Sequence, residues 1–328
     1  MRSEAIKQKL KIKNISIPGK TFLVGEYAAL LGGPCLGLAT SPCFTLKETF
    51  LKAENADGEF AHPESAAGLY QAELKEKRLA GCKLNNPYHV GGFGASTAEF
   101  IALYLDAEIN ANAVSAPYDS RLGKINLVEK AFLKYRELYQ EKKKEQPSGA
   151  DLVTQMLGQV TFFDYREGLF KVERLAWPFE ELDFLIYSTG LKIKTHEHLR
   201  QLDRNMLEPL CNLSLNVIQT FKNKQSSNFL TEMDKWILAL EKLNLTHPQI
   251  IDLKLVLEKN IQDIKVKPCG ALGADVILVL VERSKVQHIR HQIEQLKGIS
   301  ERSDLIKGLK YIADSSHLVD GALDNSLS

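Results

Sequence analysis

Three glycines followed by hydroxyl side chains form a segment of this sequence that is suited to binding an anion. Gly91, Gly92 and Gly94 lead through Ser96 and Thr97 into an apolar run. A glycine loop that opens a helix directs unpaired backbone N–H groups and the positive end of the helix dipole toward one point. The segment therefore predicts phosphate binding, although an ordinary glycine turn before a helix has the same appearance.

A second segment, Pro18-Gly19-Lys20-Thr21, contains the Gly-Lys-Thr triplet of a Walker A loop. That motif requires another glycine five residues before the Gly of Gly-Lys, and Asn14 occupies the position. The chain also lacks the G-x-G-x-x-G fingerprint of a dinucleotide-binding loop. P-loop and Rossmann-type nucleotide binding are therefore excluded.

Two further segments contain carboxylates beside turn-forming residues. Asp151 follows Pro147-Ser148-Gly149, where a new helix is expected to begin. A carboxylate in the first turn suits the helix dipole, so a purely structural role at the helix start is one interpretation of Asp151. The other segment runs from Gly270 to Asp275 and precedes a buried apolar run. Taken alone, it indicates only a turn into a strand.

The elements that must position these segments combine helices with strands, which favours an α+β fold. Strands are expected at residues 15–17, 22–24, 44–51, 160–163, 184–187, 276–281 and 309–312. Helices are expected at residues 124–144, 195–222, 228–243 and 247–263, after residue 151, and in a segment ending near residue 295. Residues 18–20 and 267–273 are expected to form turns, and the polar residues after 318 a frayed end.

Composition excludes several classes of protein. Lys and Arg number 42 and Asp and Glu number 41 in 328 residues, so the chain has no general attraction for nucleic acid or an anionic membrane. The five cysteines form no C-x-x-C pair. This pattern favours reduced thiols in the cytoplasm over a disulfide framework or a structural zinc site. The N-terminus lacks the apolar core of a signal peptide, and no apolar run is long enough to span a bilayer.

Taken together, four segments resemble the motifs of the GHMP kinase superfamily, and those of the mevalonate-pathway kinases most closely. The first motif, in which P-G-K leads into G-E-[HY], is similar to PGKTFLVGEYAALLGG. The second, G-L-G-S-S-A, and the third, K-x-x-G-A-G-G-G-D, are similar to GGFGASTA and KPCGALGAD. The P-S-G-x-D segment of mevalonate kinases is similar to PSGADLVTQMLG. All four occur in the order of the family.

The resemblance implies an ATP- and Mg²⁺-dependent kinase. It places the ATP phosphates over the second motif, on Gly91, Gly92, Gly94, Ala95, Ser96 and Thr97. It assigns Mg²⁺ to the hydroxyl of Ser96 and to a carboxylate on the helix before the P-S-G segment. Glu137 is the candidate for this carboxylate, and Glu129 and Glu141 are rivals. Asp151 is the implied catalytic carboxylate. Lys20 is implied to keep it ionised and to stabilise the transferring phosphoryl group.

The resemblance also implies a pocket for the acceptor alcohol. Its candidate residues are Glu26, Lys192, Lys194, Thr195, Gly270 and Ala271. The P-S-G-x-D segment favours mevalonate as the acceptor. Phosphomevalonate is the alternative, because Glu26-Tyr27-Ala28, Ser188-Thr189-Gly190 and Asp275 are more typical of phosphomevalonate kinase. Galactokinase and homoserine kinase match the sequence less well, and the decarboxylase branch of the superfamily is a further alternative.

Some departures from the motifs favour a different class of protein, a non-catalytic binding or regulatory protein with the same fold. Ala95 replaces a serine of the second motif, and Leu272 and Ala274 replace glycines of the third. Lys20, Ser96 and Asp151 are intact, which favours the kinase.

The implied fold has two lobes. The first is similar to ribosomal protein S5 domain 2 and the second is ferredoxin-like, with a boundary near Trp177-Pro178-Phe179 that gives domains 1–178 and 179–328. The implied protein is a cytoplasmic monomer or homodimer that acts on a small molecule and binds neither nucleic acid nor membrane.

Overall fold

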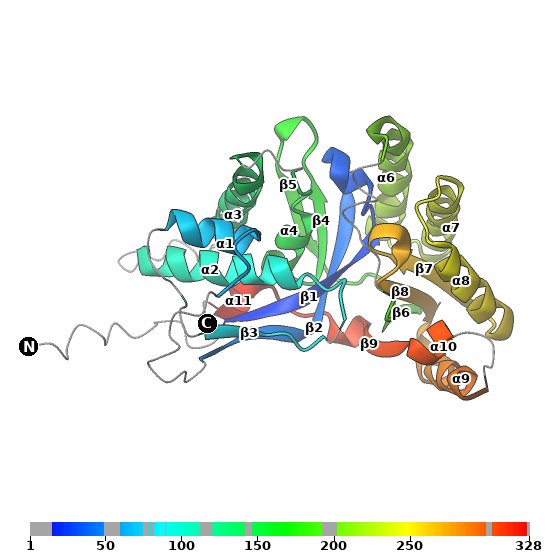
Figure 1. Cartoon of the computed structure of the whole chain (residues 1–328). Coiled ribbons are helices and arrows are strands. Elements are labelled where there is room, and N and C mark those ends of the chain that lie inside the picture. The colour runs from blue at the N-terminus through cyan, green and yellow to red at the C-terminus, as the bar shows by residue number, and fades with distance from the viewer. Residues whose placement is uncertain are drawn as a thin grey trace, which may run out of the picture.

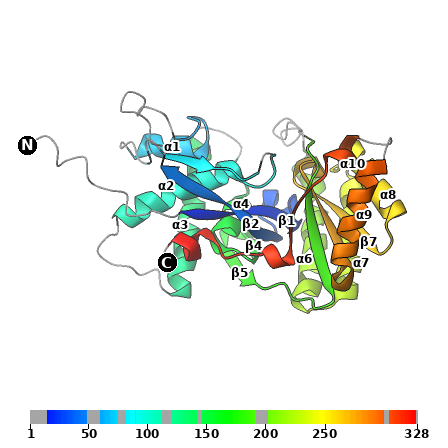
Figure 2. The same cartoon turned by 90° about the horizontal axis from the view of Figure 1, so that it is seen from below.

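The computed structural model of the chain describes residues 15–48, 60–74, 79, 82–88, 90–111, 120–141, 146–191, 202–299 and 304–326. Helices and strands are both abundant in these ranges and form two lobes, which lie side by side in Figures 1 and 2. The α+β class expected from the sequence is confirmed. None of the helices in the described ranges combines the length and the apolar character needed to cross a bilayer.

The first lobe contains an antiparallel sheet in the order β1-β2-β4-β5, with β3 paired to β2. Its strands are β1 (Ser16–Val24), β2 (Cys35–Glu48), β3 (Cys82–Asn85), β4 (Val160–Asp164) and β5 (Lys171–Leu175). Its helices include α1 (Ala66–Glu73), α2 (Ala95–Ala111), α3 (Arg121–Glu141) and α4 (Ala150–Leu157). Because α2 and α4 both pack on β1 and β2, the glycine loop before α2 and the P-S-G-x-D segment at the start of α4 lie close to the P-G-K segment of β1.

Strand β1 runs without interruption through Pro18-Gly19-Lys20, where the sequence predicts a turn between two short strands. Its pairing with β2 shifts register between Ile17 and Gly19. Proline has no N–H to donate to a sheet, and such a shift is a place where a strand tolerates it. Lys20 therefore lies inside a strand, opposite Ala39, and is only 8% exposed.

The second lobe contains an antiparallel sheet in the order β7-β8-β6-β9. Its elements are β6 (Leu182–Ser188), α6 (Glu208–Lys222), α7 (Ser226–Lys242), α8 (Pro248–Asn260), β7 (Ile264–Cys269), β8 (Val276–Glu282), α9 (Val286–Ile299), α10 (Asp304–Gly308) and β9 (Lys310–Asp314). Helices lie between β6 and β7 and again between β8 and β9. This βαββαβ connectivity confirms the expected ferredoxin-like lobe.

Both faces of the second sheet are buried. Alternate residues of a strand point to opposite faces, and in β6 both sets belong to hydrophobic cores. Phe184 and Ile186 of β6 belong to a large core that includes residues of α6, α7 and the first lobe. Leu185 and Tyr187 belong to a separate cluster with residues of α8 and α9. The larger core joins the two lobes.

The C-terminal segment returns to the first lobe, where the sequence predicts a frayed end. Leu318 forms an isolated bridge with Thr40, and Asp320 forms one with Gly158. Helix α11 (Ala322–Ser326) then packs on α4 and β1, with Leu323 only 1% exposed. Figure 2 shows this red segment crossing between the lobes. The proposed domain boundary at residue 178 falls between β5 and β6. Residues 318–326, which would belong to the second domain, contact the first lobe instead.

Short 3-10 turns connect several of these elements. They are η1 (Ala28–Leu31), η4 (Arg166–Gly168), η5 (Arg204–Leu207), η6 (Ala271–Gly273), η7 (Arg283–Lys285) and η8 (Ser315–His317).

Candidate active site

Helix α4 directs one carboxylate into a site between the P-G-K segment of β1, the glycine loop before α2 and residues 270–275. Seven of its eight residues are buried, and Asp151 is the exception, with a side chain 33% exposed. The N-cap of α4 is Gly149, which adopts φ +73° and contributes no side-chain bond. Asp151 is therefore not the cap of the helix, and the buried α4 fixes the direction of its carboxylate.

Lys20 is the partner of Asp151. Its Nζ lies 2.8 Å from Asp151 Oδ1 and 4.9 Å from the centre of the Phe22 ring, and its side chain is 11% exposed. Its backbone N–H donates to the carbonyl oxygen of Phe93 at 3.1 Å. Two residues that are far apart in sequence thus form an ion pair, and a backbone hydrogen bond ties this pair to the glycine loop.

The glycine loop has the strained backbone that only glycine adopts easily. Gly92 and Gly94 have φ of +93° and +84°, and α2 begins directly afterwards at Ala95. Ser96 is exposed in the first turn, whereas Thr97 is buried. Of the two hydroxyl residues, Ser96 is therefore the one able to reach a ligand.

Gln155 lies against this loop and was not predicted from the sequence as a site residue. It lies one helical turn after Asp151 on α4 and is fully buried. Its Nε2 donates to the carbonyl oxygen of Pro18 at 2.8 Å, and a Cβ placed on Gly94 would lie 2.9 Å from its Oε1. One face of α4 thus contacts both β1 and the glycine loop.

The third segment brings Asp275 against the glycine loop. A Cβ placed on Gly91 would lie 3.5 Å from Asp275 Oδ1, and one placed on Gly270 would lie 3.4 Å from Asp275 Oδ2. Burial raises the pKa of the Asp275 carboxyl, and the positive charge of Lys20 acts in the opposite direction. Asp275 therefore lies between the two glycine segments and within the field of the Lys20–Asp151 pair.

A hydrogen-bonded tyrosine holds the third segment in place. Leu272 adopts a left-handed conformation with φ +53°, which costs energy for a residue with a side chain. Its N–H donates to the hydroxyl of Tyr27 at 2.9 Å, and its carbonyl accepts from the N–H of His247 at 2.8 Å. The Tyr27 hydroxyl in turn donates to the carbonyl of Leu245 at 3.2 Å. The loop therefore keeps a conformation suited to glycine although leucine occupies the position.

Replacing Tyr27 by phenylalanine should destabilise the protein by about 1–3 kcal/mol, because it leaves a partly buried N–H and a buried carbonyl without their partner. Thermal unfolding followed by circular dichroism should show a lower Tm. Tyr187→Phe is the matched control, because the buried hydroxyl of Tyr187 has no hydrogen-bond partner among the described residues. Equal Tm values for the two variants would contradict the role given to Tyr27.

Glu26, a predicted substrate residue, forms a buried ion pair. Its Oε1 lies 2.7 Å from Lys267 Nζ, and the two side chains are 6% and 0% exposed. The Lys267 ammonium also donates to the carbonyl of Phe22 at 3.3 Å. The pair joins β1 and its following turn to β7, so Glu26 has a structural partner in the second lobe. Its contact with a substrate stays a prediction.

Glu137, the predicted metal carboxylate, lies away from these contacts. It is on α3, its side chain is 55% exposed, and it pairs with Lys134 at 3.1 Å. Lys134 also pairs with Glu73 of α1. Over the described ranges, no group of three or more His, Cys, Asp or Glu side chains is placed to hold a metal ion. The metal role of Glu137 stays a prediction.

The remaining predicted residues divide into two groups. Gly270 lies against Asp275, and Ala271 follows it in η6. Lys192, Lys194 and Thr195 lie outside the described residues.

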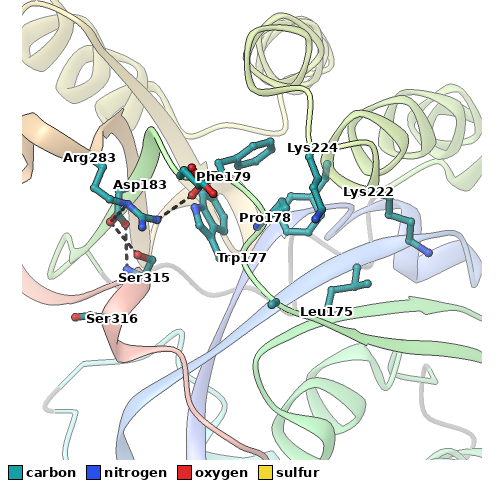
Figure 3. Close-up of a pocket in the computed structure, with 13 residues that line it drawn as sticks. Leu175, Trp177, Pro178, Phe179, Asp183, Lys222, Lys224, Arg283, Ser315 and Ser316 are labelled. Carbon is teal, nitrogen blue, oxygen red and sulfur yellow. Dashed lines mark hydrogen bonds and ion pairs between the residues drawn. The ribbon is translucent and has the colours of Figure 1, made fainter.

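A cavity of about 770 Å³ lies at the other end of β6. It is lined by Trp177, Phe179, Asp183, Lys224 and Arg283, among others. Figure 3 shows Arg283 reaching both Asp183 and the backbone of Phe179. In the sheet, Leu182 pairs with Glu282 near this cavity, whereas Ser188 pairs with Val276 next to Asp275. The cavity is thus separate from the Lys20–Asp151 site.

No family model matches the chain, and no curated protein is similar to it in sequence. Solved structures do match. Streptococcus pneumoniae phosphomevalonate kinase in complex with phosphomevalonate and AMPPNP is similar with a TM-score of 0.64 at 15% identity, covering 92% of this chain and 98% of the other. L. major mevalonate kinase in complex with R-mevalonate is similar with a TM-score of 0.61 at 14% identity, covering 91% of this chain and 94% of the other.

Lactococcus lactis galactokinase in complex with galactose is similar with a TM-score of 0.61 at 11% identity, covering 95% of this chain and 94% of the other. At such identities a structural likeness shows the fold and not the activity. The fold expected from the four segments is confirmed: this chain has the two-lobed fold of the GHMP kinases.

Proposed function

We propose that this protein is an ATP- and Mg²⁺-dependent kinase that phosphorylates a small alcohol of the mevalonate pathway. One observation carries the proposal. The Lys20–Asp151 ion pair, 2.8 Å long, is joined to a glycine loop at the start of α2 by the hydrogen bond from Lys20 N–H to Phe93 O. A group that can handle a hydroxyl proton and a loop that can bind phosphate thus belong to one site.

Each part of the site has a task in phosphoryl transfer. ATP with Mg²⁺ supplies the phosphoryl group, and the protein contributes mainly position and charge. Asp151 orients the acceptor hydroxyl and receives its proton. Lys20 stabilises the negative charge that develops beside Asp151. The backbone N–H groups after Gly94 hold the phosphates.

The donor groups near the loop suit Mg²⁺ bound to a nucleotide. This ion prefers oxygen ligands, keeps several waters and uses only one or two protein carboxylates when phosphates complete its shell. The exposed hydroxyl of Ser96 is an oxygen donor of this kind.

Mevalonate is the acceptor that we favour, because of the P-S-G-x-D segment around Asp151. Phosphomevalonate is the alternative, and solved structures of kinases for both acceptors share the fold at comparable TM-scores. All five cysteines are free thiols, which supports a reducing cytoplasmic location. A monomer or a homodimer is compatible with this proposal.

A non-catalytic protein with this fold is the second candidate, and the replaced glycine at Leu272 is the observation that favours it. The left-handed backbone at Leu272 weakens this candidate, because the loop keeps its shape despite the substitution.

The test is ADP production by the purified protein with ATP, Mg²⁺ and a panel of alcohols and phosphoalcohols. We expect release of ADP with mevalonate or phosphomevalonate, and none when EDTA removes the metal. A failure of every acceptor to stimulate ADP release, in protein that is folded by circular dichroism, would favour the non-catalytic candidate.

A further inference from the structure

Asp275 is the carboxylate in this site that the preceding account leaves without a task. It follows η6 and directly precedes β8, and its backbone carbonyl accepts from Thr189 N–H at 3.1 Å. This bond holds the main chain and does not involve the carboxylate. The carboxylate is partly buried, and within the described ranges it accepts no hydrogen bond. A carboxylate in such a place is costly unless it is paired.

The surroundings of Asp275 are those of a phosphate site. Its two oxygens lie against the backbones of Gly91 and Gly270, and its Cβ would lie 2.6 Å from a Cβ placed on Gly92. The glycines therefore allow Asp275 to lie directly against the loop that holds the phosphates in the proposed function. Larger residues at these positions would push the carboxylate away from the loop.

Among the described residues, the charges in this part of the site do not balance. Lys20 is the ammonium that acts on Asp275, but its Nζ is already 2.8 Å from Asp151. One positive charge thus serves two carboxylates before any phosphate arrives. A nucleotide adds further negative charge beside Asp275, and like charges at short range repel strongly in a partly buried site. A divalent cation between carboxylate and phosphate converts this repulsion into attraction.

We infer that Asp275 is a ligand of the divalent cation that binds with the nucleotide. This inference rests on the proposed function, and it gives to Asp275 the task that the sequence assigned to Glu137. The two residues differ in their contacts. Glu137 already has an ammonium partner in Lys134, whereas the Asp275 carboxylate lies against glycine backbone and, within the described ranges, accepts no hydrogen bond.

Nucleotide binding in the presence and absence of metal tests the inference. The dissociation constant of AMPPNP is measured by calorimetry with Mg²⁺ and with EDTA, for the wild type and for Asp275→Asn. In the wild type, Mg²⁺ should tighten binding. In the variant this Mg²⁺ effect should shrink by about ten-fold or more, since losses around a metal site are typically of this size. With EDTA, the variant should bind at least as tightly as the wild type, because a repulsive charge is gone.

Further variants make the result specific. Asp252→Asn, at an exposed position of α8, should keep the wild-type Mg²⁺ effect. Asp275→Cys should bind AMPPNP more tightly with Cd²⁺ than the wild type does, because a thiolate prefers soft ions. The Cd²⁺ comparison with the wild type corrects for the five native cysteines.

Several outcomes would overturn the inference. An unchanged Mg²⁺ effect in Asp275→Asn would do so, as would an equal loss of affinity with Mg²⁺ and with EDTA, which indicates a structural role in the loop. Loss of the Mg²⁺ effect in Glu137→Gln, with retention in Asp275→Asn, would return the ligand to Glu137. Failure of the wild type to bind AMPPNP under either condition would overturn the proposed function and this inference with it.

Discussion

Replacing Asp151 by asparagine should lower kcat at least about 100-fold, the lower end of what a positioned general base contributes. Asparagine has the same size and keeps an oxygen that can accept from Lys20 Nζ, but it cannot receive the proton of the acceptor. The Tm should change little, since Gly149 and not Asp151 is the N-cap of α4. Affinity for AMPPNP should also change little, because the loop that holds the phosphates is intact.

Steady-state kinetics with the acceptor identified in the panel, calorimetry with AMPPNP and thermal unfolding measure these three quantities on one protein. Asp252→Asn serves again as the control, and its kcat should equal that of the wild type. Turnover of Asp151→Asn within a few-fold of the wild type would show that Asp151 is not the catalytic carboxylate.

Replacing Gly94 by valine should weaken AMPPNP binding by about ten-fold or more. Gly94 has φ +84°, which is strained for any residue with a Cβ and most of all for a β-branched one. The new Cβ would also lie 2.9 Å from Gln155 Oε1. Gln155 cannot yield easily, because it is fully buried and bonded to Pro18. Strain of about 1–3 kcal/mol at this point must shift the loop that binds the phosphates.

Calorimetric titration with AMPPNP and Mg²⁺ measures the effect, and circular dichroism shows whether the variant is folded. Gly298→Val on α9 is the control, since nothing lies within 4 Å of a Cβ at that position and its φ is not in the left-handed region. A folded Gly94→Val variant with wild-type affinity would place the nucleotide elsewhere on the protein.

The sequence predicted those parts of the fold that local patterns determine. The apolar run of β8 and the helix that begins beside Asp151 are present. Of the helix expected at residues 195–222, α6 forms the part Glu208–Lys222, after the 3-10 turn η5. Strands β3, β5 and β7 were missed. In β7, Lys265 and Lys267 interrupt the apolar pattern, and the expected turn over residues 267–273 includes the end of the strand. Lys267 is tolerated there because Glu26, far away in sequence, is its partner.

Strand β5 was missed for a related reason. Its residues are exposed or only partly buried, so the sequence shows no apolar run to indicate a strand. It is held by its pairing with β4 at the sheet edge. Hydrogen bonding between distant parts of the chain leaves no local signal in the sequence.

The residues of the candidate site were likewise predicted only in part. Lys20 and Asp151 were predicted from motif resemblance, and they form an ion pair. Gln155, Tyr27 and Asp275 could not be given their places in advance, because each acts through a contact with a segment far away in the chain. The only sequence signal for Gln155 was its position four residues after Asp151, since residues four apart share a face of a helix.

The return of the C-terminal segment has a consequence for the order in which the protein matures during synthesis. Domains generally fold as units, N-terminal first, while the ribosome is still adding residues. Here α4 and β1, which carry Asp151 and Lys20, pack against α11, which follows the second lobe in the sequence. Val319 completes the backbone pairing of Ala39 and Gln159 only after it has been synthesised. The lobe made first is therefore completed only after residues 319–326 have been synthesised, which is after the strands of the second lobe.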